Sequence, residues 1–360
     1  NGSMLAVKPE NGDGDFTFSR NSAATRVNAQ GLVEDVASNL PRIDYTDGCG
    51  NLKLEPQSTN LITYSEDFSQ WNADGDTTIE SGYLAPDGTN NAYKVSGTND
   101  ALILNSVSNL GINTTRSIYA RTVSGSGTAS LTSYFGNTNN IFTLTEQWQR
   151  FEVNNSISTG STIFYGADFR GGTLNELILW GANATNDQDY ATSYIPTTQG
   201  AISTRLADIA NNSGNASLIN SEEGVLYAEI SAFEETNSFE SISINNNSTS
   251  DRIFMGYYTD DLYITVVNGG QAKYDVSTPI NVKQNNKIAV KYKAQDFCFY
   301  LNGFKINASV GINGGTTPIG LSKLSFDRGD GVEPYYGKVK ALAVYKTALT
   351  DAQLTELTTI

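Results

Sequence analysis

The chain has 360 residues, of which 39% are hydrophobic and 10% aromatic, so it can fill the cores of two or three domains. Its 38 acidic and 23 basic residues leave a formal net charge of −15, which disfavours binding to nucleic-acid phosphates and to anionic membranes. It contains no histidine, which excludes Ser-His-Asp and Cys-His catalysis, a histidine general base and His-based zinc sites.

Short alternating segments are expected along most of the chain. The 33 glycines and the many Ser and Thr residues favour short strands joined by tight turns. Helical periodicity occurs only near the C-terminal end, and we find neither a signal peptide nor an apolar run long enough to span a bilayer. Cys49 and Cys298 lie in different segments and are expected to be unpaired thiols. The sequence therefore predicts an all-β protein.

Residues 1–59 are expected to form an extended N-terminal arm. Phe16 and Phe18 alternate with polar residues there, as in a short strand. Arg20, Arg26 and Arg42 lie among acidic residues, and we expect them to hold the arm against its neighbour. A solvated surface position is the alternative for each arginine.

A long motif extends from Asp15 to Trp71, with DFTFSRNSAATRVNAQGLVEDVASNLPRIDY followed by LKLEPQSTNLITYSEDFSQW. It resembles a segment of bacteriophage tail and other virion structural proteins. The resemblance implies a virion protein from a tail fiber or another host-facing appendage, exposed to the extracellular medium. It also implies contacts with other virion proteins and a homo-oligomer, often a trimer.

Residues 60–208 contain several short alternating segments bounded by Gly, Asn or Ser, among them AYKVSG, RSIYARTVSGSG and WQRFEVNNSI. Strands at this spacing predict a jelly-roll sandwich. The closing stretch, ATSYIPTTQGAISTRLAD, resembles the end of a carbohydrate-binding-module-like domain in phage tail proteins. Many such modules hold a structural calcium ion through an acidic residue. This chain departs from that pattern, because Ser69 stands at the corresponding position.

Residues 209–223 are rich in Asn and Ser and are expected to be a linker to the last unit, 224–360. In that unit, alternating apolar residues lead to an Asn-Gly pair at Asn302, which suits a tight hairpin turn. A further strand begins near Gly337, and a short helix with Thr350 as its N-cap follows. This order resembles the laminin-G/concanavalin A-like lectin sandwich, a fold that hosts lectins, enzymes and spacers alike.

Exposed aromatic rings beside polar side chains are typical of sugar-binding sites. The best candidates are two Tyr-Tyr pairs, because adjacent residues of a strand point to opposite faces and one of each pair must lie outward or in a loop. The first pair has acidic neighbours and is expected to line a shallow glycan groove, while a structural or interface role is the alternative for each tyrosine. The candidate carbohydrate-binding residues are Tyr257, Tyr258, Asp260, Asp261, Tyr263 and Tyr335.

No catalytic residue is expected. The lectin-like fold also hosts glycosidases, which resemble one another in an E-x-D-x-x-E strand that this chain lacks. Glu234, Glu235 and Glu240 have a different spacing and are expected in a solvated loop. Laminin-G-like sandwiches often hold calcium at one rim through Asp, so the resemblance implies Asp327 and Asp330 as candidate ligands of a structural calcium ion, and a tight Asp-Gly turn is the alternative.

The expected function is that of a non-catalytic virion protein that binds carbohydrate, with host cell-surface polysaccharide as its partner. The runner-up is a polysaccharide-degrading tail enzyme, which a clustered acid pair in a concave groove would favour. A purely structural virion protein is the third hypothesis. Flat sandwich faces without exposed aromatic rings would favour that last one.

Overall fold

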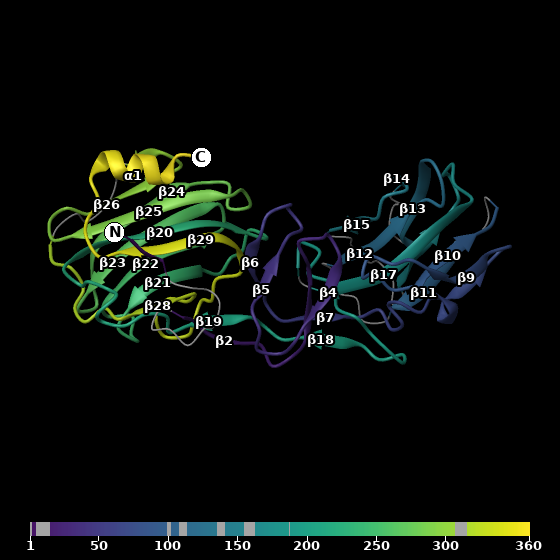
Figure 1. Ribbon diagram of the computed structural model, residues 1–360, viewed down its shortest axis with the longest axis horizontal. Coiled ribbons are helices and arrows are strands. Elements are labelled where there is room, and N and C mark those ends of the chain that lie inside the picture. Colours follow the sequence, from purple (N-terminus) through teal and green to yellow (C-terminus); the bar gives the residue numbers. More distant parts are fainter. Residues whose placement is uncertain are drawn as a thin grey trace.

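The computed structural model describes residues 2–4, 15–98, 102–107, 114–134, 141–154, 163–186, 188–306 and 315–360. It is nearly all β, with 49% strand and 4% helix, which confirms the predicted class. Figure 1 shows two strand-rich lobes joined by a narrower middle. We call residues 60–186 the first lobe and residues 209–360 the second lobe.

The second lobe is a sandwich of two sheets. One sheet contains, in order across it, β27 (Phe304–Ile306), β26 (Cys298–Leu301), β25 (Asn286–Lys293), β20 (Glu223–Ala232), β29 (Gly337–Tyr345), β6 (Asn51–Leu54) and β5 (Arg42–Asp44), with β1 (Gly2–Met4) also paired to β29. The other contains β24 (Gln271–Pro279), β23 (Asp261–Asn268), β22 (Arg252–Tyr258), β21 (Glu240–Asn245) and β28 (Lys323–Ser325).

One apolar core fills the space between these two sheets. Leu226 and Val290 project from the first sheet, Ile244 and Ile264 project from the second, and all four side chains are fully buried. Successive residues of a strand point to opposite faces of its sheet, so the side chains that enter this core lie two residues apart on each strand. Each such side chain contributes about 1.5–3 kcal/mol through burial, which makes this core the main source of the lobe's stability.

Two local signals near the C-terminal end behave as the sequence predicts. Asn302 and Gly303 have φ angles of 50° and 88°, as a tight Asn-Gly hairpin requires. The hydroxyl of Thr350 accepts a hydrogen bond from the Gln353 amide, and the Gln353 side chain accepts one from the Thr350 amide. These reciprocal bonds form a capping box at the start of the closing helix.

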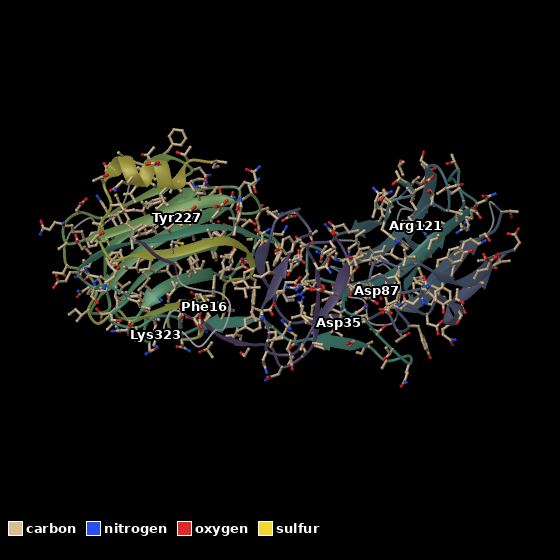
Figure 2. All side chains as sticks on the ribbon, viewed as in Figure 1. Phe16, Asp35, Asp87, Arg121, Tyr227 and Lys323 are labelled. Carbon is tan, nitrogen blue, oxygen red and sulfur yellow. The ribbon has the colours of Figure 1, made fainter. Side chains whose placement is uncertain are left out.

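The closing helix α1 (Asp351–Thr358) covers the outer face of the larger sheet (Figure 1). Its Leu354 is fully buried and packs in a cluster with Tyr227, which Figure 2 labels on that sheet. Leu357 of the same helix packs against this cluster, three residues after Leu354, so the two leucines form the apolar face that fixes the helix on the sheet. Within the described residues, no helix has the length and apolarity needed to cross a membrane.

The first lobe is a second sandwich. One sheet contains β15 (Gln149–Val153), β12 (Thr114–Arg121), β17 (Glu176–Asn186), β10 (Ala92–Ser96) and β9 (Thr78–Tyr83). The other contains β14 (Ile141–Leu144), β13 (Gly127–Tyr134), β16 (Ile163–Asp168), β11 (Leu102–Val107) and β8 (Asn72–Asp74), and a 3-10 turn (Phe68–Gln70) precedes β8. Val95, Ile118, Leu131 and Leu179 are buried between the two sheets. The expected tandem of β-sandwiches is therefore present.

The N-terminal segment is built into the body of the protein. Phe16 is buried in the second lobe and lies 5.0 Å from the ring of Phe326 (Figure 2). The remaining short strands pair in three ladders, which are β2 (Thr17–Ser19) with β19 (Ile209–Asn211), β7 (Ser58–Asn60) with β18 (Ser203–Arg205), and β3 (Ala24–Val27) with β4 (Val33–Val36). The extended arm is thus an integral part of the fold.

The segment expected as a linker, 209–223, is also packed against the second lobe. Its first residues form β19, and Ser213 forms an isolated bridge with Leu324. Ile219 is buried in the main core of that lobe. The Asn- and Ser-rich composition suggested a flexible connection, whereas these few apolar side chains hold the segment in place.

A network of buried ion pairs holds the two lobes together at the junction. Arg20 lies 2.9 Å from Asp208, Arg42 lies 2.7 Å from Glu55, and Arg42 also contacts Asp208. Arg205 contacts Glu55 as well, and every one of these side chains is almost completely buried. Arg20, Arg42 and Glu55 lie in the segment that leads into the first lobe, and Arg205 and Asp208 lie in the segment that leads out of it. The ion pairs therefore fix these two segments to each other.

These contacts confirm the expected role of Arg20 and Arg42. Arg26 differs, because its partner Glu34 and its own side chain are both partly exposed. Burial acts to raise the pKa of Glu55, but the positive charges of Arg205 and Arg42 hold that pKa well below its ordinary value. The Glu55 carboxyl is therefore an ion at the centre of the junction.

Candidate functional site

A groove of about 470 Å³ lies where the second lobe meets the two chain segments that flank the first lobe. Four parts of the chain form its walls, namely Pro56 after β6, Gln188 after β17, the loop from β20 into the start of β21, and the segment before β29. The loop contributes Glu234, Thr236, Ser238, Phe239 and Glu240, and the segment before β29 contributes Val332, Glu333, Pro334 and Tyr336. No short stretch of sequence contains the groove, since its walls come from the second lobe and from the two segments that flank the first lobe.

The loop between β20 and β21 is fixed against the segment that follows the first lobe. The amide of Asp189 donates a hydrogen bond of 2.7 Å to a Glu234 carboxylate oxygen. The ring of Tyr190 stacks on that of Phe233, with centroids 4.7 Å apart and planes 17° apart. The backbone carbonyl of Thr236 accepts a hydrogen bond from the turn between β22 and β23. These contacts give the groove a defined shape.

Glu240 is the most unusual side chain in the groove. It begins β21 and shares a strand face with Ile242 and Ile244, so it lies at the edge of the apolar core. It is only 8% exposed, lines the groove, and accepts no hydrogen bond from any described residue. Burial and the charge of Glu234 raise the pKa of Glu240 to about 9. At neutral pH it is a protonated hydrogen-bond donor.

The structure corrects the expected solvated loop for two of the three glutamates. Glu240 is buried for the reason just given, and Glu234 is partly buried and bound to the backbone of Asp189. Burial also raises the pKa of Glu234 above its ordinary value. Glu235 is exposed, as expected, and lies 3.8 Å from Lys283.

An aromatic patch adjoins the groove. Phe239 lines the groove and points to the face of the sheet opposite to Glu240. Its ring lies 4.9 Å from that of Tyr258 and 5.2 Å from that of Tyr263, and the two tyrosine rings meet edge to face at 6.2 Å. All three rings are partly exposed. We call Phe239, Tyr258 and Tyr263 the aromatic patch.

The other candidates for sugar binding fall into two groups, one beside the aromatic patch and one buried in the core. Asp260 and Asp261 lie at the turn between β22 and β23, next to the aromatic patch, and Asp260 is exposed. Tyr257 and Tyr335 are 3% and 1% exposed, and their hydroxyl groups donate to backbone carbonyls of β20. The expectation for Tyr257 and Tyr335 is corrected, because both are the inward members of their pairs. In the second pair it is Tyr336 that lines the groove.

The candidate calcium ligands have protein partners instead. An Asp327 carboxylate oxygen accepts a 2.6 Å hydrogen bond from the Gly329 amide, and Arg328 binds Asp330 at 2.9 Å. Burial raises the pKa of Asp327, which disfavours the charge that a calcium ion needs. Among the described residues, no group of three or more His, Cys, Asp or Glu side chains is arranged to hold a metal ion. The geometry matches the alternative of a tight Asp-Gly turn.

The sequence did not indicate Gln188, Phe239 and Glu240 as groove residues, and in the second Tyr-Tyr pair Tyr335 was selected instead of the groove residue Tyr336. A signal existed for Glu240, because it precedes Ile242 at a spacing of two and thus occupies an inward position of a strand. The other three lie on segments far apart in the chain. Their convergence depends on contacts between the second lobe and the segment that follows the first lobe.

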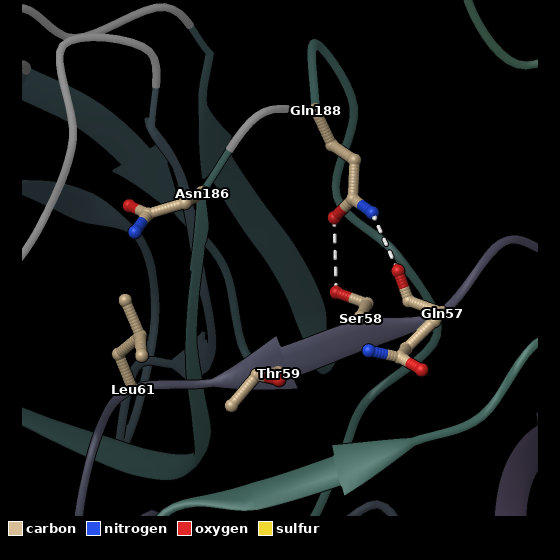
Figure 3. A pocket seen from close by; sticks show the side chains of 6 residues that line it. All are labelled: Gln57, Ser58, Thr59, Leu61, Asn186 and Gln188. Atoms are coloured by element: carbon tan, nitrogen blue, oxygen red, sulfur yellow. Dashed lines mark hydrogen bonds between the residues drawn. The ribbon is translucent and has the colours of Figure 1, made fainter.

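A second hollow of about 360 Å³ shares Gln188 with the groove. Figure 3 shows the Gln188 amide between Ser58 and Gln57, where it accepts a bond of 2.9 Å from the Ser58 hydroxyl and donates one of 3.2 Å to the Gln57 carbonyl. Thr59, Leu61 and Asn186 complete this mostly polar lining (Figure 3). Gln188 is therefore held rigidly between two hollows.

No family model and no curated protein matches this sequence. Similar solved structures include the Ruminococcus gnavus IT-sialidase CBM40 bound to α2,3-sialyllactose, at 17% identity over 42% of this chain and 94% of that one, with a TM-score of 0.34. Domains LG4-5 of the mouse laminin α1 chain match at 10% identity over 78% and 94%, with a TM-score of 0.28. A tail fiber protein of an E. coli phage matches at 10% identity over 82% and 40%, with a TM-score of 0.22.

Proposed function

We propose that this chain is a non-catalytic virion protein that binds host-surface carbohydrate in the groove at the junction side of its second lobe. The observation that carries the proposal is the meeting of a buried, unpaired carboxyl group, Glu240, with the rings of Phe239 and Tyr336 in one groove. Sugars present hydroxyl groups that both donate and accept hydrogen bonds, and apolar ring faces that pack on aromatic side chains. The groove offers partners for both.

The aromatic patch extends this surface away from the groove. Tyr258 and Tyr263 are partly exposed, and their hydroxyl groups have no hydrogen-bond partner among the described residues. Asp260 and Asp261 add carboxylate groups at the adjacent turn. A polysaccharide longer than the groove has further contacts available there, which supports a chain-like ligand over a monosaccharide.

The virion assignment rests on the sequence resemblance between Asp15 and Trp71. That segment contributes Arg20, Arg42 and Glu55 to the buried junction, so it belongs to the same folded body as the groove. We place the protein in a tail fiber or another appendage exposed to the medium. Its neighbours there would be other virion proteins and further copies of this chain, with a trimer as the expected homo-oligomer.

A polysaccharide-degrading enzyme is the second candidate, because Glu234 and Glu240 line one groove. A catalytic carboxyl pair needs one protonated and one ionised member at the same pH. Burial raises the pKa of Glu234 as well as that of Glu240, so neither environment favours the ionised form. This similarity of the two carboxyl groups supports binding over hydrolysis.

The test is to incubate the purified protein with surface polysaccharides from candidate host bacteria and to measure retention and new chain ends together. We expect retention without new ends. Phe239→Ala should weaken retention about tenfold, equivalent to about 1.4 kcal/mol, because it removes a ring of the groove. Phe304→Ala is the matched control, since Phe304 is 74% exposed on a hairpin and is absent from the groove lining. New chain ends would instead support the enzyme.

A further inference from the structure

The charges around the groove restrict the sugars that fit it. Glu234, Glu240 and Glu333 line the groove, and its described lining contains no Lys or Arg. The nearby Arg328 is engaged by Glu333 at 3.0 Å and by Asp330. A carboxylate on a ligand would enter a half-enclosed site with acidic neighbours and with no cation in its described lining, which is unfavourable.

The three glutamates differ in whether their carboxyl groups have a hydrogen-bond or ion-pair partner within the protein. Glu234 accepts a backbone hydrogen bond from Asp189, and Glu333 pairs with Arg328. Glu240 alone among them has no partner in the described residues, although it is more than nine-tenths buried. Buried polar groups in folded proteins almost always have a partner. The open side of Glu240 faces the groove, so a ligand is the partner that completes it.

A hydroxyl group suits this position. A protonated carboxyl donates through its O–H and accepts through its other oxygen, and a hydroxyl can take both roles in return. We propose that the groove selects neutral saccharides, with Glu240 donating a hydrogen bond to a ring hydroxyl, and that it rejects saccharides bearing uronic or sialic acid groups. This inference rests on the proposed function and specifies the ligand class of the same groove.

Few titratable groups other than Glu240 are placed to change the affinity of the groove for a ligand with pH. Besides Glu234, the titratable groups that interact with it are tyrosines: Tyr190 after the first lobe, Tyr257 from β22, and Tyr335 and Tyr336 before β29. Burial raises the pKa of every one of these tyrosines, to about 12 for Tyr336, so all stay neutral in ordinary buffers. A change in binding near pH 9 therefore reports on Glu240.

The first measurement uses an array of neutral oligosaccharides and the same backbones carrying uronic or sialic acid, such as lactose and sialyllactose, at pH 7. We expect neutral members to bind and their acidic counterparts to bind at least about tenfold more weakly. Stronger binding to the acidic members would overturn this inference and leave the proposed function standing. No binding to any member or to host polysaccharide would instead overturn the proposed function.

The second measurement follows the best neutral oligosaccharide from pH 6 to pH 10 with two variants. Wild-type affinity should fall about tenfold one unit above the midpoint near pH 9, because only about a tenth of Glu240 remains protonated. Glu240→Met should lose binding at every pH, since it fills the space without a donor. Glu240→Gln should restore binding and remove the pH dependence, because its amide donates but cannot ionise.

Glu235→Gln is the matched control, since Glu235 lies in the same loop, is exposed and does not line the groove. It should leave affinity and pH profile as in the wild type. A Glu240→Gln variant that keeps the wild-type pH profile, or that binds no better than Glu240→Met, would contradict the assignment of Glu240 as the hydrogen-bond donor. Thermal unfolding of each variant at pH 7 and 10 separates lost binding from lost structure.

Discussion

Two glutamates near the junction of the lobes are buried to a similar degree but have opposite environments. Glu55 is 1% exposed and receives two arginines and the hydroxyl of Ser193. Glu240 is 8% exposed and receives nothing from the described residues. The pKa of Glu55 lies well below its ordinary value, whereas that of Glu240 is raised to about 9. Burial removes water from both, and the partners decide which one is an ion.

The difference indicates where function resides. The partners of Glu55 all come from the chain itself, so this carboxylate has no capacity left for a ligand and its role is structural. Glu240 keeps unused hydrogen-bonding capacity at an opening, which is a property of binding and catalytic groups. Both residues have strongly shifted pKa values, so a shifted pKa alone does not distinguish the structural carboxylate from the candidate binding group.

The largest expected effect comes from removing the charge at the structural member of this pair. Glu55→Gln leaves Arg42 and Arg205 buried without their shared counter-ion. We expect a loss of about 3–5 kcal/mol in the free energy of unfolding, measured by denaturant titration at pH 7. A loss below about 1 kcal/mol would mean that the junction tolerates an unpaired arginine and that the network is not essential for stability.

In the groove, the Glu240→Gln substitution is expected to raise the free energy of unfolding, whereas Glu55→Gln lowers it. Above pH 4.5 the unfolded chain loses the Glu240 proton that the folded chain keeps up to about pH 9, so wild-type stability falls as pH rises through this window. Glu240→Gln cannot lose a proton and should be more stable by about 3 kcal/mol at pH 7. Unfolding free energies at pH 5, 7 and 9 should show this gain increasing with pH. Parallel profiles for the two proteins would contradict the assignment.

The same linkage gives Glu55 a different pH window. Its folded-state pKa is lowered, so the stability it contributes is present above pH 4.5 and is lost as pH falls below that value. The stability advantage of the wild type over Glu55→Gln should therefore decrease as the pH falls below 4.5. The stability gain from Glu240→Gln should decrease as the pH falls from 9 toward 4.5.

The smallest effect is expected for the exposed ion pair of the arm. Arg26 and Glu34 are 29% and 36% exposed, so water screens their attraction. Arg26→Gln should change the free energy of unfolding by less than about 1 kcal/mol in the same denaturant titration. A loss as large as that of Glu55→Gln would show that exposure is a poor guide to the strength of these pairs.

Local rules predicted much of the fold from the sequence. Asn302 with Gly303 and the cap at Thr350 depend only on neighbouring residues, so their structures follow from short stretches. Arg20 and Arg42 were expected to hold the arm, since arginines amid acidic residues tend to find partners. Their burial, however, depends on Asp208, which lies on the far side of the first lobe in the sequence.

The groove itself could not be predicted, because its walls come from four distant segments. Alternation predicted that Tyr335 and Tyr336 face opposite ways, but which of them faces inward depends on the sheet it meets, and the expected member was the buried one. The loop composition around Glu234 suggested solvent, whereas a contact with Asp189 covers it.

The position of the arm also sets an order of events during synthesis. Leu52 on β6 pairs with Val339 on β29, so the arm leaves the ribosome long before its partner strand exists. All strands of the first lobe are made in between, and that lobe can fold as soon as β17 has emerged. Until β29 arrives, β6 must wait without this partner, and the late closure of this long loop is expected to limit the folding rate of the whole chain.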